Sequence, residues 1–175
     1  MATDDLTSDD IAAIRAMIVR AFTARPDGTF SDDDWAHAVG GVHVILDVDG
    51  RIAAHAAVVE RELHVGGEPL TSGYVEAVAT EPADQGTGFG SMVMAEVADV
   101  IAEGYELGAL STGSPGFYER LGWRRWAGPT YVRTAAGEVR TADDDDGILV
   151  LVAPASPPID PGATISCEDR AGDVW

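Results

Sequence analysis

The segment that most constrains this chain is a glycine-rich turn between a strand-like run and a helix-like run. Residues 74–79 are mostly apolar, residues 91–102 have helical composition, and the sequence Gln85-Gly86-Thr87-Gly88-Phe89-Gly90 leads from one to the other. Glycine lets the backbone approach a ligand closely, and the first amides of the following helix have no partner within it. The turn therefore predicts a site for a phosphate-bearing ligand, with an ordinary strand-to-helix connection as the alternative.

The spacing of this turn excludes two common nucleotide motifs. No Lys follows Gly90, as a P-loop requires, and the third glycine and later acid of a dinucleotide site are also missing. The pattern Q-x-x-G-x-G instead resembles the coenzyme A loop of the GNAT acyltransferase superfamily.

Composition predicts one domain over residues 1–175, because a chain of this length that is 46% hydrophobic can bury a sizeable core. No apolar run is long enough to span a bilayer, and the first residues lack a secretory signal pattern, so we expect a cytoplasmic protein. The single cysteine, Cys167, cannot form an internal disulfide, and the four histidines have no metal-ligand spacing. We therefore expect no metal and a buried or inert cysteine.

The formal net charge of -19, with Arg as the only strongly basic residue type, argues against a nucleic-acid partner. The acid excess is either a solvated surface or a field that attracts a polycationic substrate. Acids are concentrated in apparent loops at residues 32–34, 143–146 and 169–173, and loops can converge on a site. This distribution favours the second interpretation.

The N-terminal half predicts two helices followed by three antiparallel strands. A first helix is indicated by Ile11, Ile14, Ile18 and Phe22 at helical spacing after a cap in Ser8-Asp9-Asp10. Ser31 and Asp34 have capping-box spacing for a second, short helix that stops at Gly40-Gly41. Strands are expected at residues 42–48 and 52–62, joined by a type I′ turn at Asp49-Gly50, and at residues 70–80 after Gly66-Gly67.

The C-terminal half predicts a buried strand at residues 107–111 and a brief helix from Ser114-Pro115 through Leu121. Later strands are expected at residues 123–126, 130–133 and 148–152, before a Pro-rich segment carries the chain to its end. This order favours an α+β fold with a central mixed β-sheet flanked by helices.

Segments spread over most of the chain resemble the bacterial aminoglycoside 2′-N-acetyltransferases of the GNAT superfamily. They are Trp35, Gly40-Gly41, residues 53–58, 73–76, 107–111, 128–130 and 144–147, and the ending Arg170-Ala171-Gly172-Asp173-Val174-Trp175. The resemblance implies a GNAT fold, a homodimer, and acetyl-CoA-dependent N-acetylation of the 2′-amine of aminoglycosides, an antibiotic-resistance activity.

The resemblance also implies two catalytic residues. Glu76 would accept the proton of the amine, directly or through water, and Tyr118 would donate a proton to the departing thiolate. Each has a structural alternative, since Glu76 could be a solvent-facing strand acid and Tyr118 a core aromatic on an amphipathic helix.

The remaining implied site residues hold the two substrates. The acetyl-CoA residues are Val78, whose amide would polarise the thioester carbonyl, Ala79 and Thr80 along the pantetheine arm, and Gln85, Gly86, Thr87, Gly88, Phe89 and Gly90 at the pyrophosphate. The polycationic aminoglycoside or amino sugar would contact Asp34, Glu76, Ala77, Ser111, Asp144, Asp145, Asp173 and Trp175 with its carboxylate.

The sequence departs from the family at three places. There is no obvious strand ahead of Ile11, residues 25–29 put Thr29 where an acid is expected, and residues 113–116 are unusually glycine-rich. The open alternatives are therefore an acetyltransferase for another amino sugar, a cell-wall fragment or a polyamine, and a non-catalytic acetyl-CoA-binding module.

Overall fold

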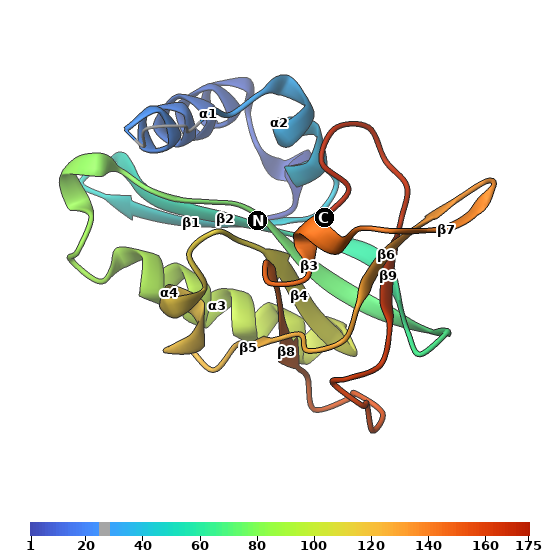
Figure 1. Cartoon of the computed structure of the whole chain (residues 1–175). Coiled ribbons are helices and arrows are strands. Elements are labelled where there is room, and N and C mark those ends of the chain that lie inside the picture. The colour runs from blue at the N-terminus through green and yellow to red at the C-terminus, as the bar shows by residue number, and fades with distance from the viewer. Residues whose placement is uncertain (25–28) are drawn as a thin grey trace. The chain divides into compact units, whose positions relative to one another are not determined.

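The computed structural model describes residues 1–24 and 29–175 (Figure 1). These residues divide into two units. Unit 1 comprises residues 1–59 and 75–99, and unit 2 comprises residues 60–74 and 100–175. Residues 25–28, where we expected the first helix to end and part of one family departure to fall, lie outside the described residues. The single domain over residues 1–175 stays a prediction.

The strands form a mixed sheet in the order β5-β8-β4-β3-β2-β9-β6-β7, with β1 paired to β2. The predicted α+β class is therefore confirmed. Among the described residues, no helix is both long and apolar enough to cross a membrane. The elements are η1 (Thr3–Asp5), α1 (Ser8–Thr23), α2 (Asp32–Ala38), β1 (Val42–Val48), β2 (Arg51–Val65), β3 (Glu68–Thr80), η2 (Pro82–Asp84), α3 (Phe89–Gly104), β4 (Leu107–Ser111), α4 (Pro115–Glu119), β5 (Arg124–Arg125), β6 (Thr130–Thr134), β7 (Gly137–Arg140), η3 (Ala142–Asp144), β8 (Ile148–Val152) and β9 (Ile165–Glu168).

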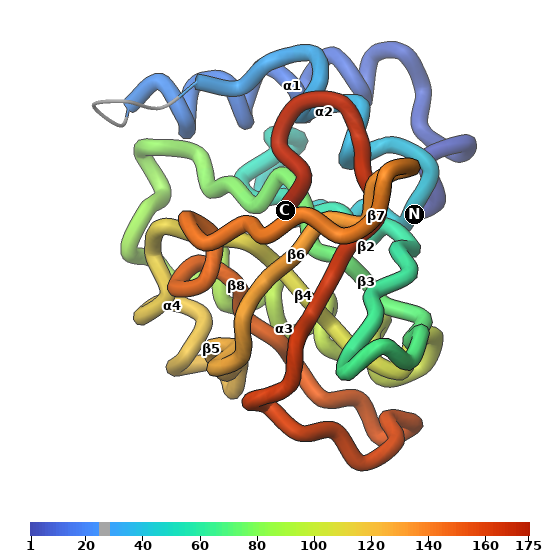
Figure 2. The backbone as a smooth tube through the Cα atoms, turned by 45° about the vertical axis from the view of Figure 1, so that its right-hand side comes forward, coloured from blue at the N-terminus to red at the C-terminus, as the bar shows by residue number. Residues whose placement is uncertain are grey.

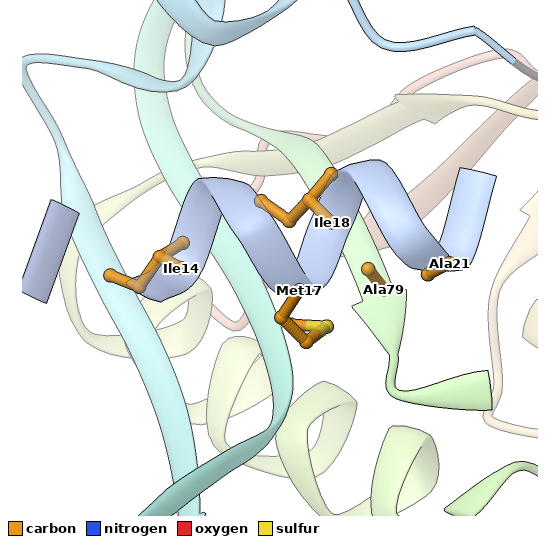
Figure 3. Close-up of a cluster of buried hydrophobic side chains, with 5 residues drawn as sticks. All are labelled: Ile14, Met17, Ile18, Ala21 and Ala79. Atoms are coloured by element: carbon orange, nitrogen blue, oxygen red, sulfur yellow. The ribbon is translucent and has the colours of Figure 1, made fainter. Parts of the chain in front are cut away.

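In unit 1, helix α1 buries one stripe of side chains against the end of β3. Ile14, Met17, Ile18 and Ala21 are buried at helical spacing and form a cluster with Ala79 (Figure 3). Ile11 and Phe22, which we also expected in this stripe, are only partly buried. The helix cap is Thr7, whose side chain forms a capping box with Asp10, so the predicted cap in residues 8–10 was wrong by one residue.

Two local predictions in unit 1 are confirmed. Ser31 and Asp34 form the second capping box, since the Asp34 carboxylate accepts from the Ser31 amide at 2.6 Å. Asp49 and Gly50 have φ values of 54° and 78°, as a type I′ turn requires between β1 and β2. The N-terminal residues also pair with β1, through a bridge between Ala2 and Val42, although the sequence showed no strand there.

In unit 2, β4 pairs in parallel with β3 and antiparallel with β8, and β9 pairs in parallel with β6. The orange β6–β7 hairpin and the red C-terminal segment can be followed in Figure 2. Strands β7 and β9 were missed in the sequence, so the expectation of a strandless end after the Pro-rich segment was wrong. Ser114 precedes α4 as predicted but makes no side-chain capping bond.

The backbone of Gly41, just before β1, lies very close to the backbone of Val58 on β2. A Cβ atom there would lie 2.0 Å from the carbonyl oxygen of Val58 on β2, so the backbone would have to move. We expect Gly41→Ala to lower the free energy of unfolding by about 3 kcal/mol in urea denaturation, because such overpacking strains the structure. Gly113→Ala is the matched control, since its Cβ would enter open space, and should change the stability by less than about 0.5 kcal/mol. Equal stability of the two variants would contradict this account.

Candidate active site

The end of β3 contains one residue in the left-handed backbone region. Ala77 has a φ of 52°, which costs a non-glycine residue about 1–2 kcal/mol. Its side chain packs against the α1 cluster, as does that of Ala79. The flanking residues Glu76 and Val78 are half-buried. Glu76, the predicted base, and Val78, the predicted amide donor, therefore lie on either side of a strained backbone residue. Backbone strain of this kind is concentrated at functional sites.

Ion pairs hold the chain between β3 and the glycine-rich turn. Arg20 of α1 makes a bidentate pair with Glu81, with its closest contact at 2.7 Å. Arg51 of β2 pairs with Asp84 at 2.6 Å, at the end of η2. Both arginines and both acids belong to unit 1. The two pairs fix the position from which the turn begins.

The glycine-rich turn itself is exposed and ordered by its own polar groups. The amide side chain of Gln85 donates to the Thr80 carbonyl at 3.3 Å, and the Thr87 hydroxyl donates to the Asp84 carbonyl at 2.6 Å. Gly86 and Gly88 have φ values of 82° and 95°, and a Cβ at either would meet nothing within 4 Å. Helix α3 then begins at Phe89, so its first amides follow an open, exposed backbone. This arrangement fits an anion such as a pyrophosphate.

In unit 2, Tyr118 lies on the short helix α4 and is 9% exposed. Its ring makes edge contacts with Phe117 and Trp123, at centroid distances of 4.9 and 6.3 Å. Its carbonyl accepts from the amides of Leu121 and Trp123, and Gly122 between them has a φ of 93°. The aromatic packing suits the structural alternative, and it also fixes the ring rigidly enough for a positioned proton donor.

The acidic loop and the C-terminal tail meet at Asp144 and Asp173. Burial raises the pKa of Asp144 from its ordinary value, and the negative charge of Asp173 raises it further. Ser111 lies beside the acidic loop, since a Cβ on Gly147 of the loop would be 3.6 Å from its hydroxyl oxygen. Two carboxylates that repel each other form a site suited to a cation.

Asp145 has a different environment from Asp144. Both of its oxygens bind Arg140, and the amide and hydroxyl of Thr130 each donate to Oδ1 at 3.0 Å. These bonds, led by that from Arg140, lower the pKa of Asp145 to about 2. Its carboxylate is thus a brace between the loop and β6, and its predicted contact with substrate competes with this internal pair.

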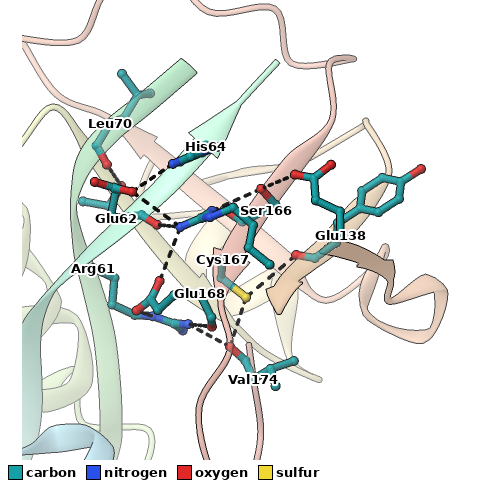
Figure 4. A network of polar contacts seen from close by, with 12 residues as sticks. Arg61, Glu62, His64, Leu70, Glu138, Ser166, Cys167, Glu168 and Val174 are labelled. Carbon is teal, nitrogen blue, oxygen red and sulfur yellow. Dashed lines mark hydrogen bonds and ion pairs between the residues drawn. The ribbon is translucent and has the colours of Figure 1, made fainter. Parts of the chain in front are cut away.

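Arg61 of β2 anchors the tail to the sheet (Figure 4). Its guanidinium is buried, donates to the Glu168 carboxylate at 2.8 Å and to the Val174 carbonyl at 2.9 Å, and lies over the Tyr74 ring. The next residue, Trp175, is buried and donates from its indole to Thr141 at 2.9 Å. Asp173 and Trp175 are therefore held by bonds on both sides of the tail. Burial also raises the pKa of the nearby Cys167 thiol to about 11, and the expected burial of this cysteine is confirmed.

The structure places the predicted residues in two groups. Unit 1 holds Asp34, Glu76, Ala77, Val78, Ala79, Thr80 and the turn 85–90, and unit 2 holds Ser111, Tyr118, Asp144, Asp145, Asp173 and Trp175. The carboxylate of Asp34 accepts from the Ser31 amide in the capping box at the start of α2. Among residues 1–24 and 29–175, no cluster of three or more His, Cys, Asp or Glu side chains could hold a metal ion. Sequence reasoning missed Arg140, Thr130 and Thr141. Thr130 and Thr141 have partners 15 and 34 residues away, whereas Arg140 lies only five residues from Asp145.

Comparisons of the fold find several solved GNAT structures. The chain matches a GNAT acetyltransferase from Brucella melitensis, solved with acetyl-CoA, at a TM-score of 0.60 and 20% identity over 91% of this chain and 90% of that one. It matches the GNAT family N-acetyltransferase YhbS from Escherichia coli, solved with CoA, at a TM-score of 0.62 and 19% identity over 93% and 86%. It also matches Eis1 from Mycobacterium abscessus at a TM-score of 0.60 and 17% identity, over 72% of this chain but only 32% of that one.

Comparisons of the sequence are more specific. Residues 2–126 match the family model of the acetyltransferase (GNAT) domain. The chain is 43% identical to an aminoglycoside 2′-N-acetyltransferase of Mycolicibacterium fortuitum over 177 residues, which cover 99% of this chain and 89% of the relative. The chain therefore belongs to the aminoglycoside 2′-N-acetyltransferase family of the GNAT acetyltransferases.

Proposed function

We propose that this protein transfers the acetyl group of acetyl-CoA to the 2′-amine of aminoglycosides by direct attack of the amine on the thioester. The observation that carries the proposal is the 43% identity to an enzyme of that name along 99% of the chain. The exposed glycine-rich turn and the paired acids Asp144 and Asp173 support it, since they suit a pyrophosphate and a polycation respectively.

Each chemical step has a group in the chain. Glu76 accepts the proton of the amine, directly or through one water, which leaves a nucleophilic lone pair. The amine nitrogen attacks the thioester carbon while the Val78 amide stabilises the oxyanion. The C–S bond then breaks, and Tyr118 protonates the thiolate of coenzyme A. Glu76 gains one proton and Tyr118 loses one, so the reaction yields the amide product and the free thiol with no net change in protons.

The acceptor is held by charge rather than by shape alone. Asp144 and Asp173 bind ammonium groups that are not reacting, with Ser111 as a neutral contact, and so leave one amine available for attack. Binding of a cation relieves the repulsion that raises the pKa of Asp144. Asp145, braced by Arg140, orients the loop that carries Asp144.

The regiospecificity of the reaction is tested with a pair of aminoglycosides. Tobramycin has a 2′-amine, whereas kanamycin A has a 2′-hydroxyl. We expect the purified chain and acetyl-CoA to mono-acetylate tobramycin but not kanamycin A, measured by thiol release and product mass. Equal reaction of both would move the site to another amine. Binding of acetyl-CoA without turnover of either would reject aminoglycoside acetylation.

Glu76→Gln should lower kcat by about 10²- to 10⁴-fold, because a positioned base contributes that much and the amide cannot accept the proton. The Kd for acetyl-CoA should stay the same, since the variant keeps the turn and the end of β3. The measurements are steady-state rates across pH and calorimetric binding of acetyl-CoA. A pH profile identical to that of the parent chain would remove Glu76 as the base.

Asp144→Asn should raise KM for tobramycin by about 10-fold or more, because a charge-assisted bond to an ammonium group is lost. The KM for acetyl-CoA should not change. Asp143→Asn is the matched control, since it removes the same charge from the exposed neighbour on η3. If both variants raise KM equally, the loop acts only through its total charge, and Asp144 has no direct contact with the acceptor.

A further inference from the structure

A chain of hydrogen bonds crosses the interior of unit 1 and ends beside the proposed base. The Thr3 hydroxyl lies 2.9 Å from Nε2 of His43, and Nδ1 of His43 lies 2.9 Å from Nε2 of His55. Nδ1 of His55 lies 2.9 Å from the carbonyl oxygen of Ala77. The two imidazoles are 1% and 0% exposed, and the steps of acetyl transfer use neither of them.

The carbonyl at one end of the chain fixes the protons on both rings, while the Thr3 hydroxyl at the other end also lies 3.2 Å from the Gly41 carbonyl. A carbonyl oxygen can only accept, so Nδ1 of His55 carries a hydrogen and donates to Ala77. Burial lowers the pKa of His55 to about 4 and also lowers the pKa of His43, so both rings are neutral at neutral pH. Nε2 of His55 then accepts from Nδ1 of His43, and Nε2 of His43 accepts from the Thr3 hydroxyl. The Gly40 amide completes the chain by donating to the Thr3 oxygen at 2.9 Å.

The Ala77 carbonyl has a second role through the peptide bond that it belongs to. The same planar group contains the amide of Val78, and in a trans peptide the C=O and the N–H point in opposite directions. A bond that fixes the carbonyl therefore also fixes the direction of the Val78 N–H. It also polarises the peptide group, which makes that N–H a stronger donor.

The backbone at this point needs such a restraint. Ala77 is left-handed, and strained conformations persist only where the surroundings fix them. The methyl group of Ala77 packs against the α1 cluster, but this contact is made by the side chain and not by the following peptide plane. The hydrogen bond from His55 acts on that plane directly.

We propose that His55 is a positioning residue for acetyl transfer, which by donating to the Ala77 carbonyl aims the Val78 amide at the thioester oxygen. This role rests on the proposed function, because that function places the thioester at Val78. His43 and Thr3 act one step further away by fixing the tautomer of His55.

Two substitutions separate positioning from packing. His55→Leu keeps most of the volume but removes the donor, whereas His55→Asn puts an amide N–H near the position of Nδ1. We expect kcat to fall about 10- to 100-fold in His55→Leu, because misaligning one oxyanion donor loses part of its effect, and to recover largely in His55→Asn. The Kd for CoA should be unchanged in both variants. A purely structural role would instead lower Tm and weaken CoA binding together with kcat.

Nuclear magnetic resonance of the unsubstituted protein tests the proposal even if the variants do not fold. We expect the ring nitrogens to report the Nδ1–H tautomer for His55, and the Val78 amide resonance to shift more with acetyl-CoA than with CoA. An Nε2–H tautomer, or equal shifts with both ligands, would overturn the proposal and leave acetyl transfer standing. Failure of acetyl-CoA to bind at all would instead reject the proposed function.

Discussion

The left-handed residue Ala77 is the constraint on which much of unit 1 depends. It lies near the end of β3, where Ala77 and Ala79 pack at α1 and the chain then leads into the glycine-rich turn. Its methyl group packs against the hydrophobic cluster, and its carbonyl is bound by His55. Because both contacts come from other elements, the local strain is supported by the tertiary structure rather than by the strand itself.

Buried polar groups in this protein are organised by the same principle in both units. In unit 1, the two neutral histidines form a satisfied row inside an apolar core. In unit 2, the buried Arg61 donates to the carbonyl of Val174 in the tail. Removing water around these groups makes each bond more directional, but it also makes an unpaired partner costly. Such networks fix the positions of backbone groups and acids that could otherwise move.

The two acidic residues of the loop illustrate how neighbours assign different roles to the same side chain. Asp145 is neutralised internally by Arg140, whereas Asp144 lies in the field of Asp173. The second environment is the one that suits a bound cation. The fold thus gives these negative charges two settings, one paired with an arginine and one beside a second acid.

Features that depend on near neighbours could be predicted from the sequence. The capping box at Ser31, the turn at Asp49-Gly50, the strand at residues 107–111 and the glycine-rich turn before α3 each follow from a few adjacent residues. The mixed sheet and the family followed instead from the order of segments along most of the chain. Strands β7 and β9, the brace on Asp145 and the bond from His55 to Ala77 became apparent only in the folded chain. Strand β7 lies next to β6 in the chain, but its residues are all exposed, so it lacks the apolar alternation that predicts a strand. Strand β9 pairs with β6, and His55 bonds to a residue 22 positions away, so both depend on distant partners for which the sequence carries no local pattern.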